Sequence, residues 1–290
     1  MQQGICNRLS IMMKKLLFTL SAMYGLAACS PELATPTAAS HTTTASAASV
    51  PALPVYTVAT DATYPPFEFY DDKGNIIGLD VDLLNAIAED QGFQVRYYHY
   101  GWKGIFGQLK DSADIIASAV AITEESKKAA DLSDEYYRSP YMAVSLMPDA
   151  LKKWKQHKIS ASHNEDTIAD LQAEYKIAGH NILPADTIYL SLTNLLKKQA
   201  DITVADATVL QYYINSATFT GYEFHTQPLP SANPETDKLV FAVAKGNEEL
   251  LEKINTGLKH IRENGKLDEI LQRWRQHLPP TEQAMLKTPV

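Results

Sequence analysis

The sequence predicts an α/β fold of two similar lobes, each a doubly wound sheet flanked by helices. Three observations support this prediction. Short β-rich runs alternate with helical patterns along most of the chain. "LKDSADIIASAV" and "LKKQADITVADA" both place a helix end, a small residue with Asp, and an apolar strand in one order. After the second of these, the strand "KLVFAVAKG" and two helices can complete the first lobe.

The first lobe opens with the β-rich run "VYTVAT" and continues into the aromatic loop "DATYPPFEFY". "DDKGNIIG" predicts a turn and a hairpin. "LDVDLLNAIAEDQG" has the period of an amphipathic helix, which Gly92 ends. The elements expected next are a strand at 93–100, a helix at 101–113, a strand at 113–120 and a helix at 123–130.

In the second lobe we expect strands at 157–163, 175–182 and 200–206, and helices at 165–174, 187–199 and 206–214. A strand at 238–246 and helices at about 247–263 and 266–276 then return to the first lobe. The expected boundaries are 55–140 and 238–278 for the first lobe, 141–237 for the second, and 279–290 for a tail.

The start of the chain predicts secretion. Lys14 and Lys15 precede an apolar run that is too short for a permanent membrane span, so residues 1–28 are interpreted as a signal peptide starting at Met1, Met12 or Met13. The run ends in "LAAC", which resembles the lipobox of bacterial lipoproteins, where Cys29 would carry the lipid. The alternative is a plain secretory signal with a coincidental cysteine.

Residues 29–54 are almost wholly small, polar or proline, which predicts a flexible tether. Ser30 follows the lipidated position, and the usual sorting rule for lipoproteins then suggests the outer membrane. The only other cysteine, Cys6, lies in the leader, so no disulfide is expected in the mature chain.

Composition narrows the class of protein. The chain has 290 residues, 45% of them hydrophobic and 21% charged, as in soluble globular proteins. A formal net charge of −8 with no basic stripe argues against a nucleic-acid partner. The eight histidines are scattered without zinc-like spacing, so neither a metal nor a cofactor is expected.

Several polar segments follow strand ends, where open α/β sheets bind their ligands. These are the aromatic loop, residues 118–121, residues 162–165 and Asp206. We therefore interpret the aromatic loop as one wall of a ligand cleft, in preference to a buried strand end.

Longer phrases carry a resemblance to a known family. They are "ATDATYPPFEFYDDKGNIIGLDVDLLNAIAEDQG", "GWKGIFGQLKDSADIIASAVAITEESKKAADLSDEYY", "KKQADITVAD" and "NGKLDEILQRW". From about residue 55 to 278, the chain resembles the type 3 extracytoplasmic solute-binding proteins, the polar-amino-acid receptors of ABC importers. The resemblance implies a type II periplasmic-binding-protein fold with the ligand cleft between the lobes.

The resemblance also implies roles for particular residues. Tyr64 and Trp102 would be aromatic walls around the solute's side chain. Asp61 would lie at the mouth of the cleft, and Asp206 would receive the α-ammonium group. Backbone groups at a strand end would be presented by Ser118, Ala119 and Ala121.

For some of these residues, a purely structural role is the alternative to solute binding. Trp102 can serve helix-to-sheet packing, and Asp206 can cap the helix that follows it. Asp80 and Asp82 are interpreted as helix-start residues favoured by the helix dipole rather than as solute contacts.

The sequence departs from the family at the solute's α-carboxylate. Where relatives carry an arginine that forks onto this group, Ser126 stands here. Lys127 follows, but it points about 100° away along the helix and lacks the planar fork. The family's Gly-Thr is replaced by Asn164-Glu165, and Glu165 would repel a carboxylate.

These departures favour a cationic or amine-type solute without an obligatory carboxylate. The alternative is an ordinary amino acid held by Lys127 or Arg138. We expect a monomeric, lipid-anchored receptor, not an enzyme, that delivers a small solute to an ABC permease. Two other functions stay open: a ligand-gated signalling or surface-interaction protein, and an enzyme similar to cyclohexadienyl dehydratase.

Overall fold

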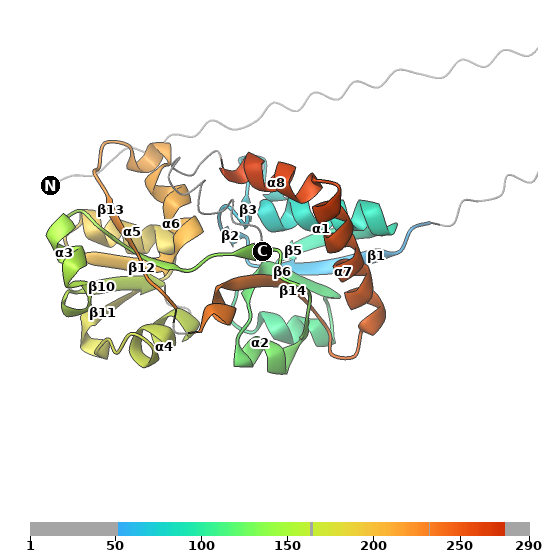
Figure 1. Cartoon of the computed structure of the whole chain (residues 1–290), viewed down its shortest axis with the longest axis horizontal. Helices are drawn as coiled ribbons and strands as arrows, with labels where there is room; N and C mark the ends of the chain where they lie inside the picture. The colour runs from blue at the N-terminus through green and yellow to red at the C-terminus, as the bar shows by residue number, and fades with distance from the viewer. Residues whose placement is uncertain (1–51, 163–164, 232, 276–290) are drawn as a thin grey trace, which may run out of the picture. The chain divides into compact units, whose positions relative to one another are not determined.

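The computed structural model describes residues 52–162, 165–231 and 233–275 (Figure 1). The predicted signal peptide, Cys29, Ser30, most of the predicted tether and the expected tail from 279 lie outside these residues. Among the described residues, no helix has the length and apolar character needed to cross a membrane.

The first sheet has the order β5-β1-β6-β14-β7, and β8 also pairs with β14. β1 is parallel to both of its neighbours, whereas β14 is antiparallel to β6, β7 and β8. The strands are β1 (Val55–Thr60), β5 (Gln94–His99), β6 (Ile115–Ala121), β7 (Asp131–Leu132), β8 (Tyr137–Arg138) and β14 (Lys238–Val243).

The second sheet has the order β11-β10-β12-β9-β13. β11, β10 and β12 are parallel, and β9 is antiparallel to β12. Each sheet thus joins three parallel strands to an antiparallel strand, which confirms the predicted likeness of the lobes. The strands are β9 (Tyr141–Ser145), β10 (Ile159–Ser162), β11 (Ile182–Ala185), β12 (Ile202–Asp206) and β13 (His225–Pro228).

The aromatic loop and the hairpin that follows it form a third, small antiparallel sheet from β2 (Thr63–Tyr64), β3 (Glu68–Tyr70) and β4 (Ile76–Ile77). It ends at Gly78, whose φ of 146° lies in a region that side chains rarely adopt. A Cβ atom at this position would lie 1.9 Å from the Phe67 carbonyl oxygen. A glycine is therefore needed to bring the start of α1 against the loop.

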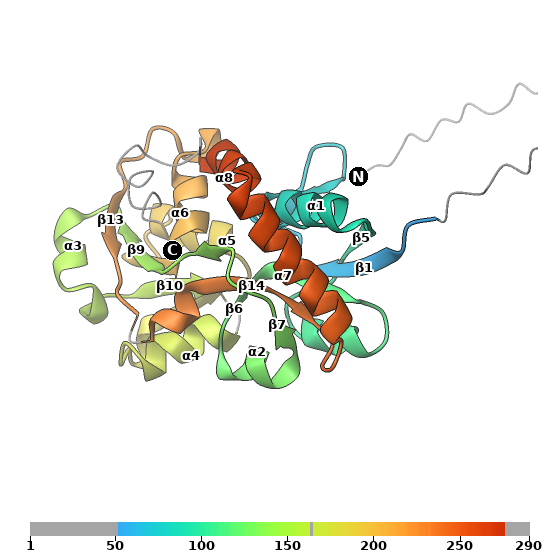
Figure 2. The same ribbon diagram turned by 45° about the vertical axis from the view of Figure 1, so that its right-hand side comes forward.

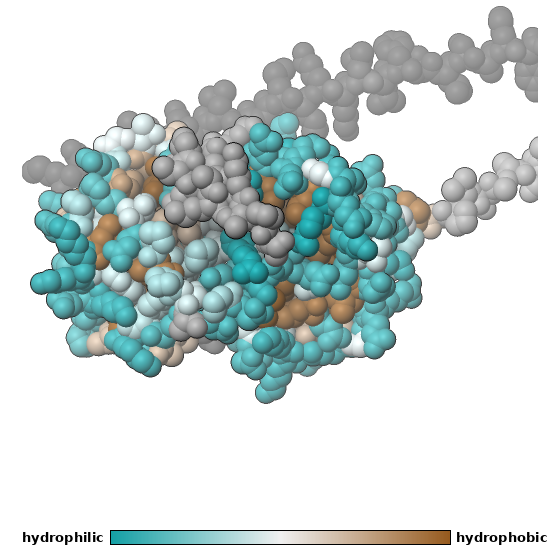
Figure 3. All heavy atoms as spheres, viewed as in Figure 1, coloured by the Kyte–Doolittle hydropathy of each residue, from teal (hydrophilic) through white to brown (hydrophobic). Residues whose placement is uncertain are grey.

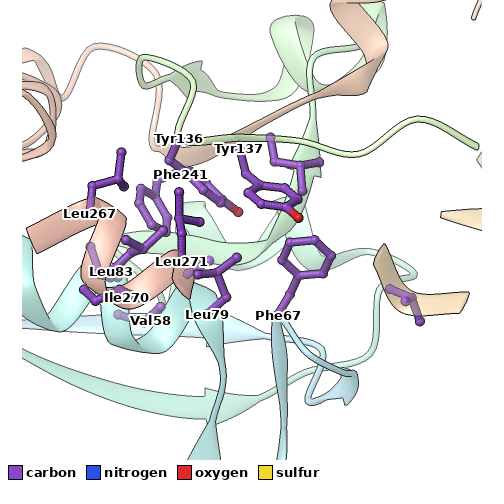
Figure 4. Packing of buried hydrophobic residues seen from close by; sticks show 14 of the residues in the cluster. Val58, Phe67, Leu79, Leu83, Tyr136, Tyr137, Phe241, Leu267, Ile270 and Leu271 are labelled. Atoms are coloured by element: carbon purple, nitrogen blue, oxygen red, sulfur yellow. The ribbon is translucent and has the colours of Figure 1, made fainter. Parts of the chain in front are cut away.

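One face of the first sheet is covered by α1 (Leu79–Gln91), α7 (Glu248–Glu263) and α8 (Lys266–Arg275) (Figure 2). Alternate strand residues point to this face, among them Val58 and Phe241. Tyr136 stacks on Phe241 with ring centroids 4.6 Å apart (Figure 4). The helices bring Leu79, Leu83, Leu267, Ile270 and Leu271 to the same cluster (Figure 4).

The opposite face, with Ala59, Ile116 and Val240, packs against a 3₁₀ helix at Ile105–Lys110 and the end of α2 (Glu124–Ala129). In the second lobe, α3 (Pro148–Lys152) and α4 (Glu165–Ala173) contribute to one cluster. There, α5 (Ile188–Leu196) and α6 (Ala207–Ile214) contribute to the cluster that contains Val58. Shorter 3₁₀ turns lie at Trp154–Gln156, Gly179–Asn181, Ala217–Phe219 and Pro234–Asp237.

The chain crosses between the two large sheets twice, from β8 to β9 and from β13 to β14. Ser139 lies on the first crossing, and its N–H donates to the Asp237 carbonyl oxygen of the second at 2.8 Å. The exact lobe limits, 55–140, 141–237 and 238–278, stay a prediction.

Two predicted elements were wrong. The expected helix at 101–113 is a 3₁₀ helix that begins after Gly104, a residue in the left-handed region (φ 83°). The expected strand at 175–182 is instead irregular chain followed by the 3₁₀ turn at Gly179–Asn181, because Lys176 takes a left-handed φ of 62° that interrupts an extended strand. The strand itself, β11, begins only at Ile182.

The face of the molecule drawn in Figure 3 is mostly hydrophilic, with hydrophobic residues in separate patches. Pairs of opposite charge lie at the surface of the molecule, such as Lys152 with Asp149 and Lys253 with Glu249. Exposed pairs of this kind add little stability.

Candidate functional site

Asp61 joins two loops at the carboxyl ends of the first sheet to the strand β6. Its N–H donates to Ser118 Oγ at 3.0 Å, and its Oδ2 accepts the Trp102 N–H at 2.9 Å. Its Oδ1 accepts a hydrogen bond from the Thr63 hydroxyl at 2.9 Å. The loops that follow β1 and β5 are thereby held against the end of β6, so Asp61 organises the backbone at the position where a solute is expected.

His99 lies next to this carboxylate, with its Nδ1 3.9 Å from Asp61 Oδ1. The same nitrogen accepts the Ala62 N–H at 3.1 Å.

Behind Ser118 lies Glu68, a buried carboxyl group that the sequence analysis did not single out. Ser118 Oγ donates to Glu68 Oε1 at 3.1 Å, while Oε2 is buried and makes no described hydrogen bond. Burial raises the pKa of Glu68 well above its usual value, and the nearby carboxylates of Asp80, Asp61 and Asp206 raise it further.

Asp80 supports the same strand end from α1. Its Oδ2 accepts the Ala119 N–H at 2.9 Å, and its Oδ1 accepts the Tyr136 hydroxyl at 2.7 Å. Ala119 has a left-handed φ of 44°, so these contacts hold a strained backbone. Burial raises the pKa of Asp80 to about 7. The residue does lie in the first helical turn, as expected, but its side chain acts on the backbone of Ala119.

Asp82 faces a different partner. Its Oδ2 accepts from Arg273 at 3.0 Å and from Trp274 Nε1 at 2.9 Å, both on α8. Asp82, which lies on α1, therefore links α1 to α8.

Ser126, at the position of the family's arginine, is buried and bonded within its own turn. Its Oγ donates to the Ala121 carbonyl oxygen at 2.8 Å and accepts the Thr123 N–H at 2.9 Å. With the Thr123 hydroxyl these bonds form a capping box at the start of α2. That Ser126 or Ala121 contacts a solute stays a prediction.

Asp206 is the last residue of β12 and the N-cap of α6, so its capping alternative is realised. Its Oδ1 accepts the Ser139 hydroxyl at 2.7 Å and the Val209 N–H at 3.0 Å. The side chain is buried, and burial raises its pKa to about 7. The second carboxylate oxygen of an N-cap aspartate can also bind a solute, so helix capping and solute binding by Asp206 do not exclude each other.

Tyr64 lies near Asp206, although the two belong to different lobes. The pKa of Tyr64 is raised well above its usual value, first by burial and then by the Asp206 carboxylate. The ring stacks on Phe67 at 6.0 Å between centroids.

The Trp102 ring contacts Phe106 edge-on at 5.9 Å and packs with the cluster on the opposite face of the first sheet from the Tyr64 cluster. The packing alternative is therefore realised for its ring, while its backbone binds Asp61. That Tyr64 and Trp102 wall one cleft stays a prediction.

Glu165 is the first residue of α4, and Asn164 lies outside the described residues. Two cationic alternatives, Lys127 and Arg138, pair with acidic neighbours. Lys127 Nζ is 3.2 Å from Glu124, and Arg138 Nη2 is 2.7 Å from Glu135.

Together these contacts bring acidic groups to the strand ends: Asp61, Glu68, Asp80 and Asp206. Within the described part of the chain, no group of three His, Cys, Asp or Glu residues could hold a metal ion. Such an arrangement suits a cationic group on a solute, because an ammonium would favour the ionised carboxylates.

The sequence analysis missed Glu68, Tyr136 and Ser139. Glu68 stands in the aromatic loop, where its burial was not apparent from the alternating pattern. Tyr136 and Ser139 follow short strands that no periodicity indicated.

The two lobes and the polar strand ends define a solute-binding protein with the type II periplasmic fold. Residues 56–277 match the model of the bacterial extracellular solute-binding proteins, family 3, so the chain belongs to this family.

Named relatives agree with this assignment. A probable histidine-binding protein of Neisseria gonorrhoeae is 32% identical over 74% of this chain and 81% of its own length. An L-arginine-binding protein of Pseudomonas aeruginosa is 29% identical over 73% of this chain and 85% of its own length. An ancestral arginine-binding protein solved with arginine has a TM-score of 0.67 at 28% identity, covering 77% of this chain and 99% of its own.

Proposed function

We propose that this protein is the lipid-anchored receptor of an ABC importer, which captures a small cationic or amine-type solute between its lobes and delivers it to a permease. The observation that carries the proposal is the buried Asp206 carboxyl beside Tyr64. The anchor at Cys29 rests on the "LAAC" sequence, and delivery to a permease rests on family membership.

An ammonium group suits this position for two reasons. It would bind Asp206 through a charge-assisted hydrogen bond, the stronger kind available to a carboxylate. It would also approach the aromatic ring of Tyr64, which attracts cations.

The carboxylate of an amino acid has less support. The Ser126 hydroxyl is used by its own turn. Lys127 and Arg138 would have to leave Glu124 and Glu135 to reach a solute. We therefore infer that the solute needs no α-carboxylate. The competing candidate is a basic α-amino acid, which the relatives named for histidine and arginine favour.

Matched pairs of solutes separate these candidates. Agmatine and histamine are arginine and histidine without the α-carboxylate. Isothermal titration calorimetry of the purified protein should give tighter binding for the amine than for the amino acid of the same pair. Tighter binding of arginine or histidine in the wild type would overturn the inference.

A double variant provides the converse test. Ser126→Arg combined with Glu165→Thr restores the family's residues at both positions. We expect it to raise the affinity for the amino acid about ten- to hundred-fold, as charged hydrogen bonds to a carboxylate allow. Glu165→Gln alone, which removes only the charge, should give a smaller gain.

A further inference from the structure

A cavity of about 660 Å³ lies beside the small sheet of the aromatic loop. Its volume is in the range of small-molecule pockets. Of the predicted solute contacts, neither Asp61, Tyr64 nor Asp206 is among its described lining residues. Its aromatic lining comes from Phe69, Tyr70, Tyr189, Tyr212 and Tyr213. We call it the aromatic cavity.

Aromatic rings from both lobes meet in this cavity. Phe69 of β3 and Tyr212 of α6 have ring centroids 5.8 Å apart. Tyr213 lies 5.7 Å from Tyr212 and 5.8 Å from Tyr189. These mutual contacts hold the rings in place, so their faces and edges are arranged before any ligand arrives.

Two of the lining tyrosines are partly exposed. Tyr70 is 47% exposed and Tyr189 is 37% exposed. Both line the cavity, so a ligand in it can gain contact area from their exposed surface.

The charged residues in the described lining are Asp71 and Asp72. Hydrogen bonds from the Asn75 side chain and from the Asn75 and Lys73 amides lower the pKa of Asp71, so this group stays ionised at neutral pH. Lys73 also lies near Asp71 but is not one of the described lining residues. The wall is therefore both aromatic and negative.

We propose that the aromatic cavity binds a small organic cation with an apolar body, such as a quaternary ammonium, as a second site separate from Asp206. Aromatic faces attract such cations electrostatically, and the two carboxylates add to this attraction. A ligand here contacts Phe69 from one lobe and Tyr212 from the other, so it also links the lobes.

Choline and 3,3-dimethylbutan-1-ol test this proposal. The alcohol has choline's shape with carbon in place of the charged nitrogen. Titration calorimetry should show choline binding at least about tenfold tighter than the alcohol. Equal affinities, or no choline binding up to about 10 mM, would overturn the proposal.

Variants assign the binding to the cavity. Tyr212→Ala should weaken choline binding about tenfold, whereas Tyr212→Phe keeps the ring and should retain it. If Tyr212→Ala fails to fold, Tyr189→Ala serves instead, because Tyr189 is partly exposed, with Tyr189→Phe as its control. Choline binding that is lost in Asp206→Asn but unchanged in the tyrosine variants would place the cation at the first site and refute the second.

Discussion

Burial raises the pKa of Asp206 to about 7, even though Ser139 and the Val209 amide donate to it. Near neutral pH this group is therefore partly protonated before a solute binds. An ammonium beside it would favour the carboxylate and lower this pKa. Under the proposed function, solute capture below pH 7 releases a proton.

The affinity for a cationic solute should consequently fall as the pH drops below 7, by up to about tenfold per pH unit. Calorimetry between pH 5 and 8, in two buffers of different ionisation enthalpy, measures both the affinity and the proton released. Asp206→Asn should bind weakly with no such slope. A dissociation constant independent of pH in the wild type would contradict this role for Asp206.

Asp80 affects stability in the opposite pH direction. Its pKa is about 7 in the folded chain, against about 4 for an unfolded aspartate. The folded state therefore holds a proton that the unfolded state has lost. The resulting stabilisation is complete below about pH 4 and disappears as the pH rises through 7.

We predict that Asp80→Asn stabilises the protein at pH 8 and changes little at pH 5. An amide can still accept from Ala119 and bond to Tyr136 without carrying a charge. A shift of this size corresponds to at most about 4 kcal/mol of unfolding free energy. Urea unfolding at both pH values measures it, with the exposed Asp72→Asn as control. A loss of stability at pH 8 would show that the charge itself is needed.

How much of the site could be predicted depended on whether a residue's role was local. Asp206 was anticipated because its position after a strand and before a helix is visible in the sequence. Glu68 and Ser139 were not, because their importance comes from partners 50 and 67 residues away. Long-range hydrogen bonds of this kind leave no periodic signal.

At the scale of elements, the junction between the aromatic loop and α1 depends on Gly78. A methyl group here would overlap the Phe67 carbonyl and also force an unfavourable backbone angle. Gly78→Ala should cost about 3 kcal/mol or more of unfolding free energy.

Gly107→Ala is the matched control, because nothing lies within 4 Å of the added atom and the backbone angle is ordinary. It should change stability by less than about 0.5 kcal/mol. Guanidinium unfolding of both variants gives the comparison. Similar stabilities for the two variants would mean that the loop adjusts freely.

Most helices and strands were predictable because their apolar period was strong, as in α1 and β14. The strand β11 was misplaced by the apolar residues Tyr175 and Ile177, which are buried in a cluster with Leu171 of α4 rather than in a ladder. Pro184 made the strand at Ile182–Ala185 harder to recognise in the sequence, because proline is uncommon within strands. It is tolerated there because β11 is an edge strand and pairs only with β10 among the described strands.

At the scale of the whole molecule, the proposed anchor can be tested with the two cysteines of the chain. Cys29→Ala should leave the protein unprocessed or release it from membranes, whereas Cys6→Ala should have no effect. Fractionation and mass spectrometry of the mature N-terminus distinguish these outcomes. A mature protein that begins at another residue with an unmodified N-terminus would contradict the proposed lipid anchor.

The position of β14 within the first sheet has a consequence for the order in which the chain matures. This strand pairs with β6, β7 and β8, yet it is made after all the strands of the second sheet. A chain that emerges from a secretion channel amino end first cannot close its first sheet until residue 243 has passed. Until then β6 has an open edge, so a chaperone that shields exposed strands during export would act on this stretch.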